Sequence, residues 1–231
     1  MATRTIPANA ESAIIHGTGE PLEGECMEFR LRYSGRLLGS SRNDSRAEEK
    51  HRVRREFHPQ LRRHWTTDPN LLDMALYANS SFDDAESRDA LIERGWKIIS
   101  ENWSRAGYNF IPLVTEKMYL RCSLDILLLS PEDDHRIILQ GGDIDGRVKT
   151  IFDALRTPKT KEETGNQLPE DGENPFYCLL EDDSLISEVK VTTGQLLLLP
   201  SERAVTPHDV FAVIDAKLQL ERKTQWSWVF E

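Results

Sequence analysis

The sequence predicts an α/β protein of the α+β type, a mixed β-sheet with flanking helices, from three observations. Segments with the alternating pattern of strands occur near both ends of the 231-residue chain. A long helical block separates the first strand from the others, and residues 119–129 form an apolar run typical of a central strand. We expect a single domain over residues 1–231. Within this domain we expect a loose arm over residues 1–24, an enlarged N-terminal helical insertion over 42–105 and an exposed loop over 157–175.

The N-terminal half is expected to hold one strand followed by helices. Residues 26–35 alternate apolar and polar side chains, which is the period of a half-buried strand. Residues 42–58 are predicted to be helical up to Pro59, because proline cannot donate the hydrogen bond that a helix interior requires. One or two further helices are expected within residues 70–103, broken near the turn residues 79–84.

The C-terminal half is expected to alternate helix and strand. An apolar stripe at helical spacing predicts a helix that begins near Asp145 and ends before Pro158. The members of the stripe are Val148, Ile151, Phe152 and Leu155. Two strands joined by an acidic turn are predicted within residues 176–193, and a last strand at 209–221.

Charge and cysteine content narrow the class of protein. The net charge of −10 argues against a generally basic nucleic-acid-binding surface, yet residues 42–63 carry eight Arg or Lys against four Asp or Glu. The scattered Cys26, Cys122 and Cys178 form no CxxC pair, so they indicate neither a zinc site nor a disulfide framework. No apolar run reaches the ~20 residues that span a bilayer. We therefore expect a cytoplasmic protein with no membrane partner.

Two acids and a base stand where a loop becomes a helix. Asp143 and Asp145 are two apart in an extended entry, so both carboxylates are expected to point the same way. Lys149 follows one helical turn after Asp145. Paired carboxylates repel unless a cation joins them, and Mg²⁺ suits such oxygens. The alternative is simple capping, in which Asp145 closes the helix and Lys149 is a solvated base.

A second acidic cluster, Glu181, Asp182 and Asp183, follows the apolar residues 176–180. If the two clusters meet at the edge of the sheet, they form a metal site. An EF-hand is excluded, because its required glycine and glutamate would be Val148 and Ala154. A haloacid-dehalogenase-type phosphatase, which also begins with a DxDG motif, remains an alternative.

The segments "DIDGRVKTIFDAL" and "LLEDDSLISEV" together resemble the RusA family of Holliday junction resolvases. The family pattern is roughly D-x-D-N-x-x-K-x-x-x-D-A-L, then an apolar strand and E/D-D-D-S-x-I. Asp143, Asp145 and Lys149 fall on its two aspartates and its lysine, and Asp183 falls on the second acid of its DDS. The resemblance covers about residues 120–220.

This resemblance implies a Mg²⁺-dependent endonuclease that hydrolyses phosphodiester bonds in branched DNA during recombination and repair, with Mn²⁺ as a substitute ion. Asp143, Asp145 and Asp183 would bind the ion, and Asp182 would support them. Lys149 would stabilise charge on the phosphate or position the attacking water, and Asp153 could pair with it. The family's two-fold dimers imply a homodimer.

The basic segment is the expected contact with the DNA backbone, because phosphate binding requires cations. The residues predicted to make this contact are Arg46, Lys50, Arg52, Arg54, Arg55, Arg62 and Arg63, with Arg42 before them. A solvated helix that pairs with its own glutamates is the alternative for this segment. A catalytically silent relative that binds nucleic acid or protein is the alternative for the whole chain.

Overall fold

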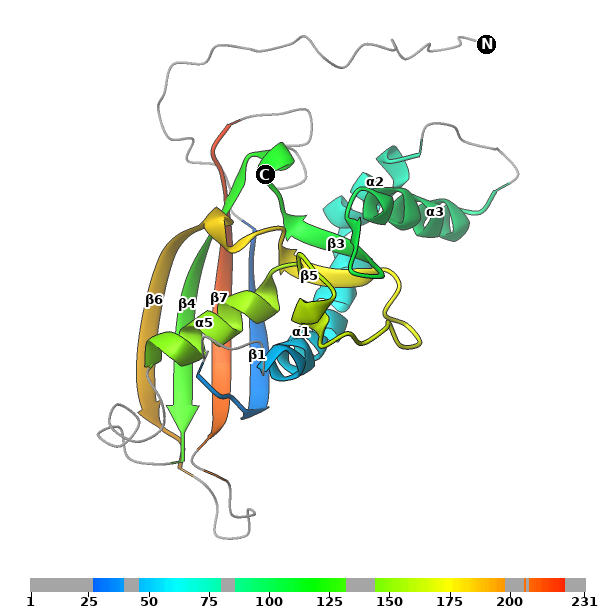
Figure 1. The fold of residues 1–231 in the computed structure, drawn as a ribbon. Coiled ribbons are helices and arrows are strands. Elements are labelled where there is room, and N and C mark those ends of the chain that lie inside the picture. The colour runs from blue at the N-terminus through cyan, green and yellow to red at the C-terminus, as the bar shows by residue number, and fades with distance from the viewer. Residues whose placement is uncertain are drawn as a thin grey trace, which may run out of the picture.

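The computed structural model describes residues 27–39, 46–79, 86–131, 144–197, 206 and 208–222. Figure 1 shows how the elements within them are arranged. The predicted arm over residues 1–24, Arg42 and Asp143 lie outside these residues, so what the sequence predicts for them stays a prediction.

A four-stranded mixed sheet in the order β1-β7-β4-β6 forms one side of the described fold. Its strands are β1 (Glu28–Arg36), β4 (Leu120–Ser130), β6 (Ile186–Gln195) and β7 (Asp209–Leu220). β7 pairs antiparallel with both β1 and β4, while β6 runs parallel to β4. Every second residue of β4 from Leu120 to Leu128 is buried. The mixed α+β class and the central apolar strand are therefore confirmed.

A smaller sheet was missed by the sequence prediction. It contains β2 (Ser104–Arg105), β3 (Tyr108–Val114) and β5 (Phe176–Leu180), in the order β2-β3-β5. β3 lies parallel to β5 and is buried at almost every position, so it lacks alternation. It also contains Pro112, a residue that argues against a strand in a sequence.

Helix α1 (Ala47–Thr67) continues through Pro59, so the prediction that it ends there is wrong. A proline inside a helix costs about 3 kcal/mol. The apolar face of α1 continues on both sides of the proline, and each buried side chain of this size contributes about 1.5–3 kcal/mol. Its buried apolar members are Val53, Phe57, Leu61 and Trp65. Burial of this stripe therefore outweighs the lost hydrogen bond.

The rest of the predicted helical insertion forms α2 (Pro69–Tyr77) and α3 (Arg88–Glu101). The Asp68 carboxylate caps α2 by accepting from the N–H groups of Asn70 and Leu71, at 3.0 and 3.1 Å. Two separate helices are thus confirmed in this region. No helix within the described ranges is long and apolar enough to cross a bilayer.

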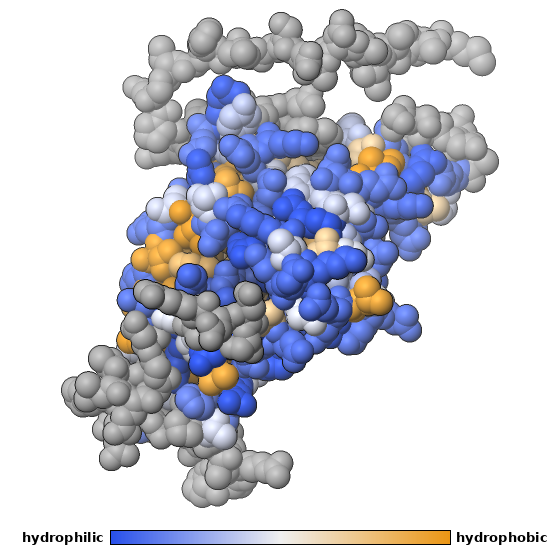
Figure 2. Space-filling model, viewed as in Figure 1, coloured by the Kyte–Doolittle hydropathy of each residue, from blue (hydrophilic) through white to orange (hydrophobic). Residues whose placement is uncertain are grey.

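Helix α5 (Ile144–Leu155) lies across the face of the four-stranded sheet (Figure 1). Its predicted stripe is directed inward, because Val148, Ile151 and Leu155 are buried. The following residues 157–175 are mostly exposed, as predicted, but buried Thr164 anchors them near α1. The face that carries these elements is largely hydrophilic, with apolar side chains in separate patches (Figure 2).

Candidate functional site

The first two turns of α5 carry the described part of the DxD motif. Asp145 lies inside the first turn rather than at the N-cap, because the helix already includes Ile144. A carboxylate there is favoured by the positive end of the helix dipole. Asp145 and Lys149 are both exposed. The Lys149 ammonium makes no ion pair or hydrogen bond with any described residue.

The second acidic cluster forms a turn after β5. Glu181 accepts from the Glu116 N–H at 3.2 Å, and Asp182 accepts from the Ser184 N–H at 3.0 Å. The Lys159 ammonium, 2.5 Å from Asp182, holds the pKa of that carboxyl well below its usual range. Asp182 is therefore occupied as a cap and an ion-pair partner. Asp183 is exposed, and its carboxylate contacts no cation within hydrogen-bonding distance in the described ranges.

The acidic turn lies beside the C-terminal end of α5. The Thr157 N–H donates to the Leu180 carbonyl at 2.9 Å, and its hydroxyl donates to the Glu181 carbonyl at 2.7 Å. Asp145 lies at the other end of the helix, about 15 Å along its axis at 1.5 Å per residue.

The three described aspartates of the expected metal site do not come together. No group of three His, Cys, Asp or Glu side chains suited to a metal ion occurs among the described residues, which include Asp145, Asp182 and Asp183. The expectation that these acids share one ion with Asp143 therefore stays a prediction, and the described residues do not bring Asp145 to the acidic turn. Periodicity placed each acid at the end of an element, but it did not specify which ends meet. The position of Asp143 lies outside the described residues.

Asp153 does not pair with Lys149 as the sequence suggested. Its carboxylate is buried and contacts Lys50 at 2.7 Å and Arg156 at 3.2 Å. Asp153 therefore faces α1, and its ion pairs join α5 to that helix. Lys149 lies on the exposed part of α5.

The prediction that Arg54 contacts the DNA backbone is wrong, because only 2% of the residue is exposed. Its guanidinium donates to the carbonyls of Asp153 and Arg156, at 2.5 and 3.2 Å. It also lies 3.1 Å from His51 Nδ1. A side chain enclosed in this way cannot reach a phosphate, so Arg54 is a structural residue.

Other cations of α1 also have internal partners. Lys50 pairs with Asp153, and Arg55 pairs with both Glu170 and Glu173 at 2.8 Å. Arg52 pairs with Glu49 at 2.9 Å and donates to the Tyr33 hydroxyl at 2.8 Å, although it is partly exposed. Of these contacts, the Arg52–Glu49 pair fits the alternative of a helix that pairs with its own glutamates, whereas the partners of Lys50 and Arg55 come from α5 and the loop of residues 157–175.

Three of the predicted contacts remain available to a ligand. Arg62 and Arg63 are exposed and Arg46 is half-buried. None of them makes an ion pair or a side-chain hydrogen bond with the described residues. The basic surface is thus smaller than the sequence indicated and lies mainly at the C-terminal half of α1.

His51 is held neutral in the interface between α1 and the smaller sheet. Its Nδ1 accepts from Arg54, so its Nε2 carries the proton that faces the Tyr108 hydroxyl at 3.0 Å. Burial, reinforced by the Arg54 and Arg55 cations, lowers the pKa of His51 to about 3. The folded state therefore disfavours its protonation.

We expect the fold to lose stability on acidification because of His51. The folded pKa lies below the unfolded value of about 6.5, so the contribution is complete above that pH and is lost as the pH falls towards about 3. The free energy of unfolding should fall by up to about 1.4 kcal/mol per pH unit in this window. Urea unfolding at several pH values measures the slope, and His51→Gln should flatten it. An unchanged slope in that variant contradicts this origin.

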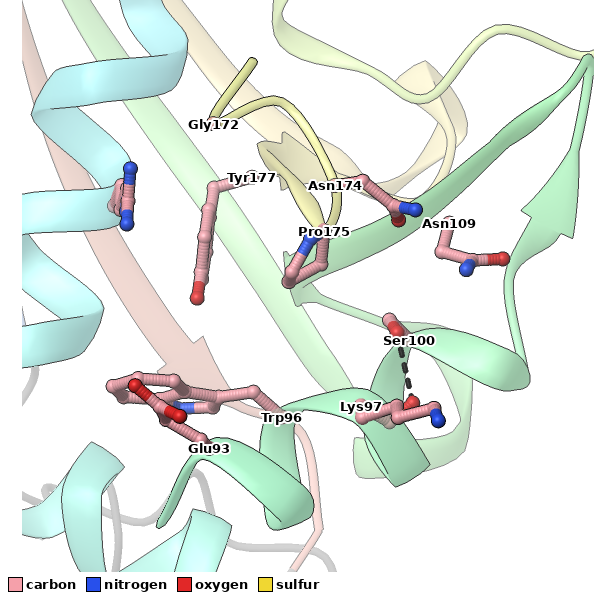
Figure 3. Close-up of a pocket in the computed structure, with 10 residues that line it drawn as sticks. Glu93, Trp96, Lys97, Ser100, Asn109, Gly172, Asn174, Pro175 and Tyr177 are labelled. Atoms are coloured by element: carbon pink, nitrogen blue, oxygen red, sulfur yellow. Dashed lines mark hydrogen bonds between the residues drawn. The ribbon is translucent and has the colours of Figure 1, made fainter. Parts of the chain in front are cut away.

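A hollow of about 360 Å³ lies between α1, α3 and the start of β5. Figure 3 shows Trp96, Tyr177 and Pro175 in its wall, with Lys97, Asn109 and Asn174 towards one side. Sequence analysis missed this site, because its residues come from four separate segments with no common motif. The part of the sequence that came nearest to indicating this site is the pair of arginines, Arg62 and Arg63, at the end of the basic segment.

Comparisons of the sequence with protein-family models and with characterised proteins, and of the fold with solved structures, give no match.

Proposed function

We propose that the protein is a Mg²⁺-dependent endonuclease that hydrolyses phosphodiester bonds in branched DNA. The observation that supports it is the exposed start of α5, where Lys149 stands one turn after Asp145 with its ammonium available. The order of strand β4, helix α5, strand β5 and acidic turn is also the order that the RusA resemblance requires.

The described residues fit a bound ion only in part. The Asp145 carboxylate is a hard oxygen ligand of the kind that Mg²⁺ prefers, but one carboxylate is too few, so Asp143 would have to supply a second. When bound, Mg²⁺ would polarise the scissile phosphate and lower the pKa of a water. The acidic turn is not placed to share that ion in the arrangement described above.

Lys149 carries the part of the chemistry that belongs to the protein. A phosphate oxygen gains negative charge during hydrolysis, and a fixed ammonium stabilises this charge more in the transition state than in the bound substrate. Because Lys149 has no internal partner in the described ranges, binding a phosphate requires no existing ion pair to break.

A catalytically silent relative that binds nucleic acid is the second candidate. The observation that favours it is the separation of Asp145 from the acidic turn, since a resolvase site of the family pattern requires these acids to meet. Arg46, Arg62 and Arg63 would then contact the backbone without cleavage. A homodimer and a cytoplasmic location are part of the proposal for both candidates, and a branched DNA substrate belongs to the endonuclease.

A nicking assay on branched and linear DNA with Mg²⁺ distinguishes the candidates. We expect Lys149→Met to lower the cleavage rate about 100-fold or more, because it removes one electrostatic stabiliser of the transition state. Its melting temperature should stay unchanged, since the side chain is exposed. Lys161→Met, an exposed lysine in the 157–175 loop, is the matched control and should cleave normally.

Further variants of the acids test the site. Loss of cleavage in both Asp143→Asn and Asp145→Asn supports the metal site at the start of α5. If Asp183→Asn loses cleavage to the same extent, the acidic turn contributes to this metal site when DNA and metal are bound. Binding without cleavage in the unchanged protein supports the silent relative, and hydrolysis of p-nitrophenyl phosphate supports the phosphatase.

A further inference from the structure

The hollow between α1, α3 and β5 has a corner built from two aromatic rings. The centroids of the Trp96 and Tyr177 rings are 6.5 Å apart, with planes inclined at 84°. Tyr177 is 2% exposed and its hydroxyl points towards Trp96, while Pro175 closes the wall beside it (Figure 3). The half-buried ring of Trp96, backed by Tyr177, provides a surface on which a flat ring of a ligand stacks.

Polar groups around this corner are mostly hydrogen-bond donors without an internal partner. The Nε1 of Trp96 is buried and makes no hydrogen bond. The Asn109 and Asn174 amides line the same hollow, and no side-chain hydrogen bond occupies them within the described residues. The Asn109 and Asn174 amides can therefore donate to or accept from a polar group of a ligand in the hollow.

Two cations stand at the rim. Arg62 on α1 and Lys97 on α3 line the hollow and are exposed, and neither pairs with an acid within the described ranges. Glu93 contributes the one carboxylate of the lining. This differs from the middle of α1, where Lys50 and Arg55 are paired internally. The lining therefore has a surplus of positive charge suited to an oxyanion.

The wall of the hollow is fixed in place before any ligand binds. His58 Nδ1 accepts from the Tyr177 N–H at 2.9 Å, so its Nε2 donates to the Gly172 carbonyl at 3.1 Å. One buried side chain thereby ties the loop before β5 to α1. A preformed wall lowers the entropic cost of binding.

We infer that this hollow binds a nucleoside phosphate moiety, with the base against Trp96 in front of the buried Tyr177 and the phosphate at Arg62 and Lys97. Either a free nucleotide or an unpaired nucleotide of a DNA strand supplies this chemistry. The lining of the hollow includes neither Asp145 nor Lys149 of the proposed cleavage site. The inference therefore does not rest on the proposed cleavage site and holds for a protein with no nuclease activity.

Calorimetric titration of the full chain tests the inference. The probes are the common deoxynucleoside 5′-monophosphates, the matching nucleosides, inorganic phosphate and a single-stranded oligonucleotide. At least one monophosphate should bind about tenfold or more tightly than both its nucleoside and inorganic phosphate, because the cations and the aromatic corner act together. Tighter binding of the oligonucleotide than of the monophosphate identifies a strand as the source, and the reverse identifies a free nucleotide.

Matched variants connect the binding to the hollow. Arg62→Ala and Lys97→Ala should each weaken binding about tenfold or more, since each removes a charge-assisted contact. Lys161→Ala, at an exposed position outside the hollow, should change the Kd less than about twofold. If neither the monophosphates nor the oligonucleotide bind to the protein, the inference is overturned. An equal effect of Arg62→Ala and Lys161→Ala also overturns it, as does inorganic phosphate that binds as tightly as the nucleotide.

Discussion

Replacing Arg54 with methionine should lower the free energy of unfolding by about 3 kcal/mol or more, because it leaves buried polar groups without partners. Methionine keeps much of the side-chain volume but donates no hydrogen bond. The carbonyls of Asp153 and Arg156 then lose a donor that water does not replace, since the Arg54 side chain is buried. His51 also loses the donor to its Nδ1. Urea unfolding followed by circular dichroism measures the change.

Arg63→Met is the matched control for this prediction. It makes the same substitution on the same helix, at an exposed position with no side-chain partner among the described residues. Its unfolding free energy should stay within about 0.5 kcal/mol of the unchanged protein. If Arg54→Met is as mild as the control and instead weakens DNA binding, Arg54 contacts the ligand and the structural role assigned to it is wrong.

Replacing Gly95 with a larger residue should force α2 and α3 apart and lower the stability of the fold. A Cβ at Gly95 would lie 1.8 Å from the Ala75 carbonyl oxygen and 2.6 Å from its carbon. Both atoms belong to the backbone, so whole helices must move. Overpacking of this kind costs about 3 kcal/mol, against a gain of about 1 kcal/mol in helix propensity for alanine.

We therefore expect Gly95→Ala to destabilise the fold by about 2 kcal/mol and Gly95→Leu by more. Thermal unfolding measures the series, and Glu101→Leu on the exposed end of the same helix is the control. Because Trp96 and Lys97 follow Gly95 directly, the hollow that they line should lose its shape in the same variants. A stable Gly95→Leu protein would show that α2 and α3 do not cross this closely.

Local patterns were sufficient to predict the elements whose burial has a simple period. The alternation in residues 26–35 and 209–221 predicted β1 and β7, and the apolar stripe from Val148 to Leu155 predicted α5. These predictions succeed because a strand or helix with one buried face repeats that face at a fixed spacing. They fail at β3, which is buried on both faces and has no such repeat.

Charged residues are harder to assign, because their neighbours are distant in sequence. The basic run in α1 looks like a phosphate-binding surface in isolation. In the fold, α1 packs against α5 and the loop of residues 157–175, which supply Asp153, Glu170 and Glu173. The cost of burying an unpaired charge requires such partners, and only the folded chain identifies them.

The sequence by itself determined the α+β class, the central apolar strand, the helix that begins near Asp145 and the acidic turn after β5. Tertiary structure alone decided that Arg54 is buried, that α1 passes through Pro59, and that Asp145 and the acidic turn adjoin opposite ends of α5. It also assembled the hollow around Trp96 and Tyr177. The physical reason is that periodicity depends on neighbours a few residues away, whereas the meeting of separate side chains depends on how whole elements pack.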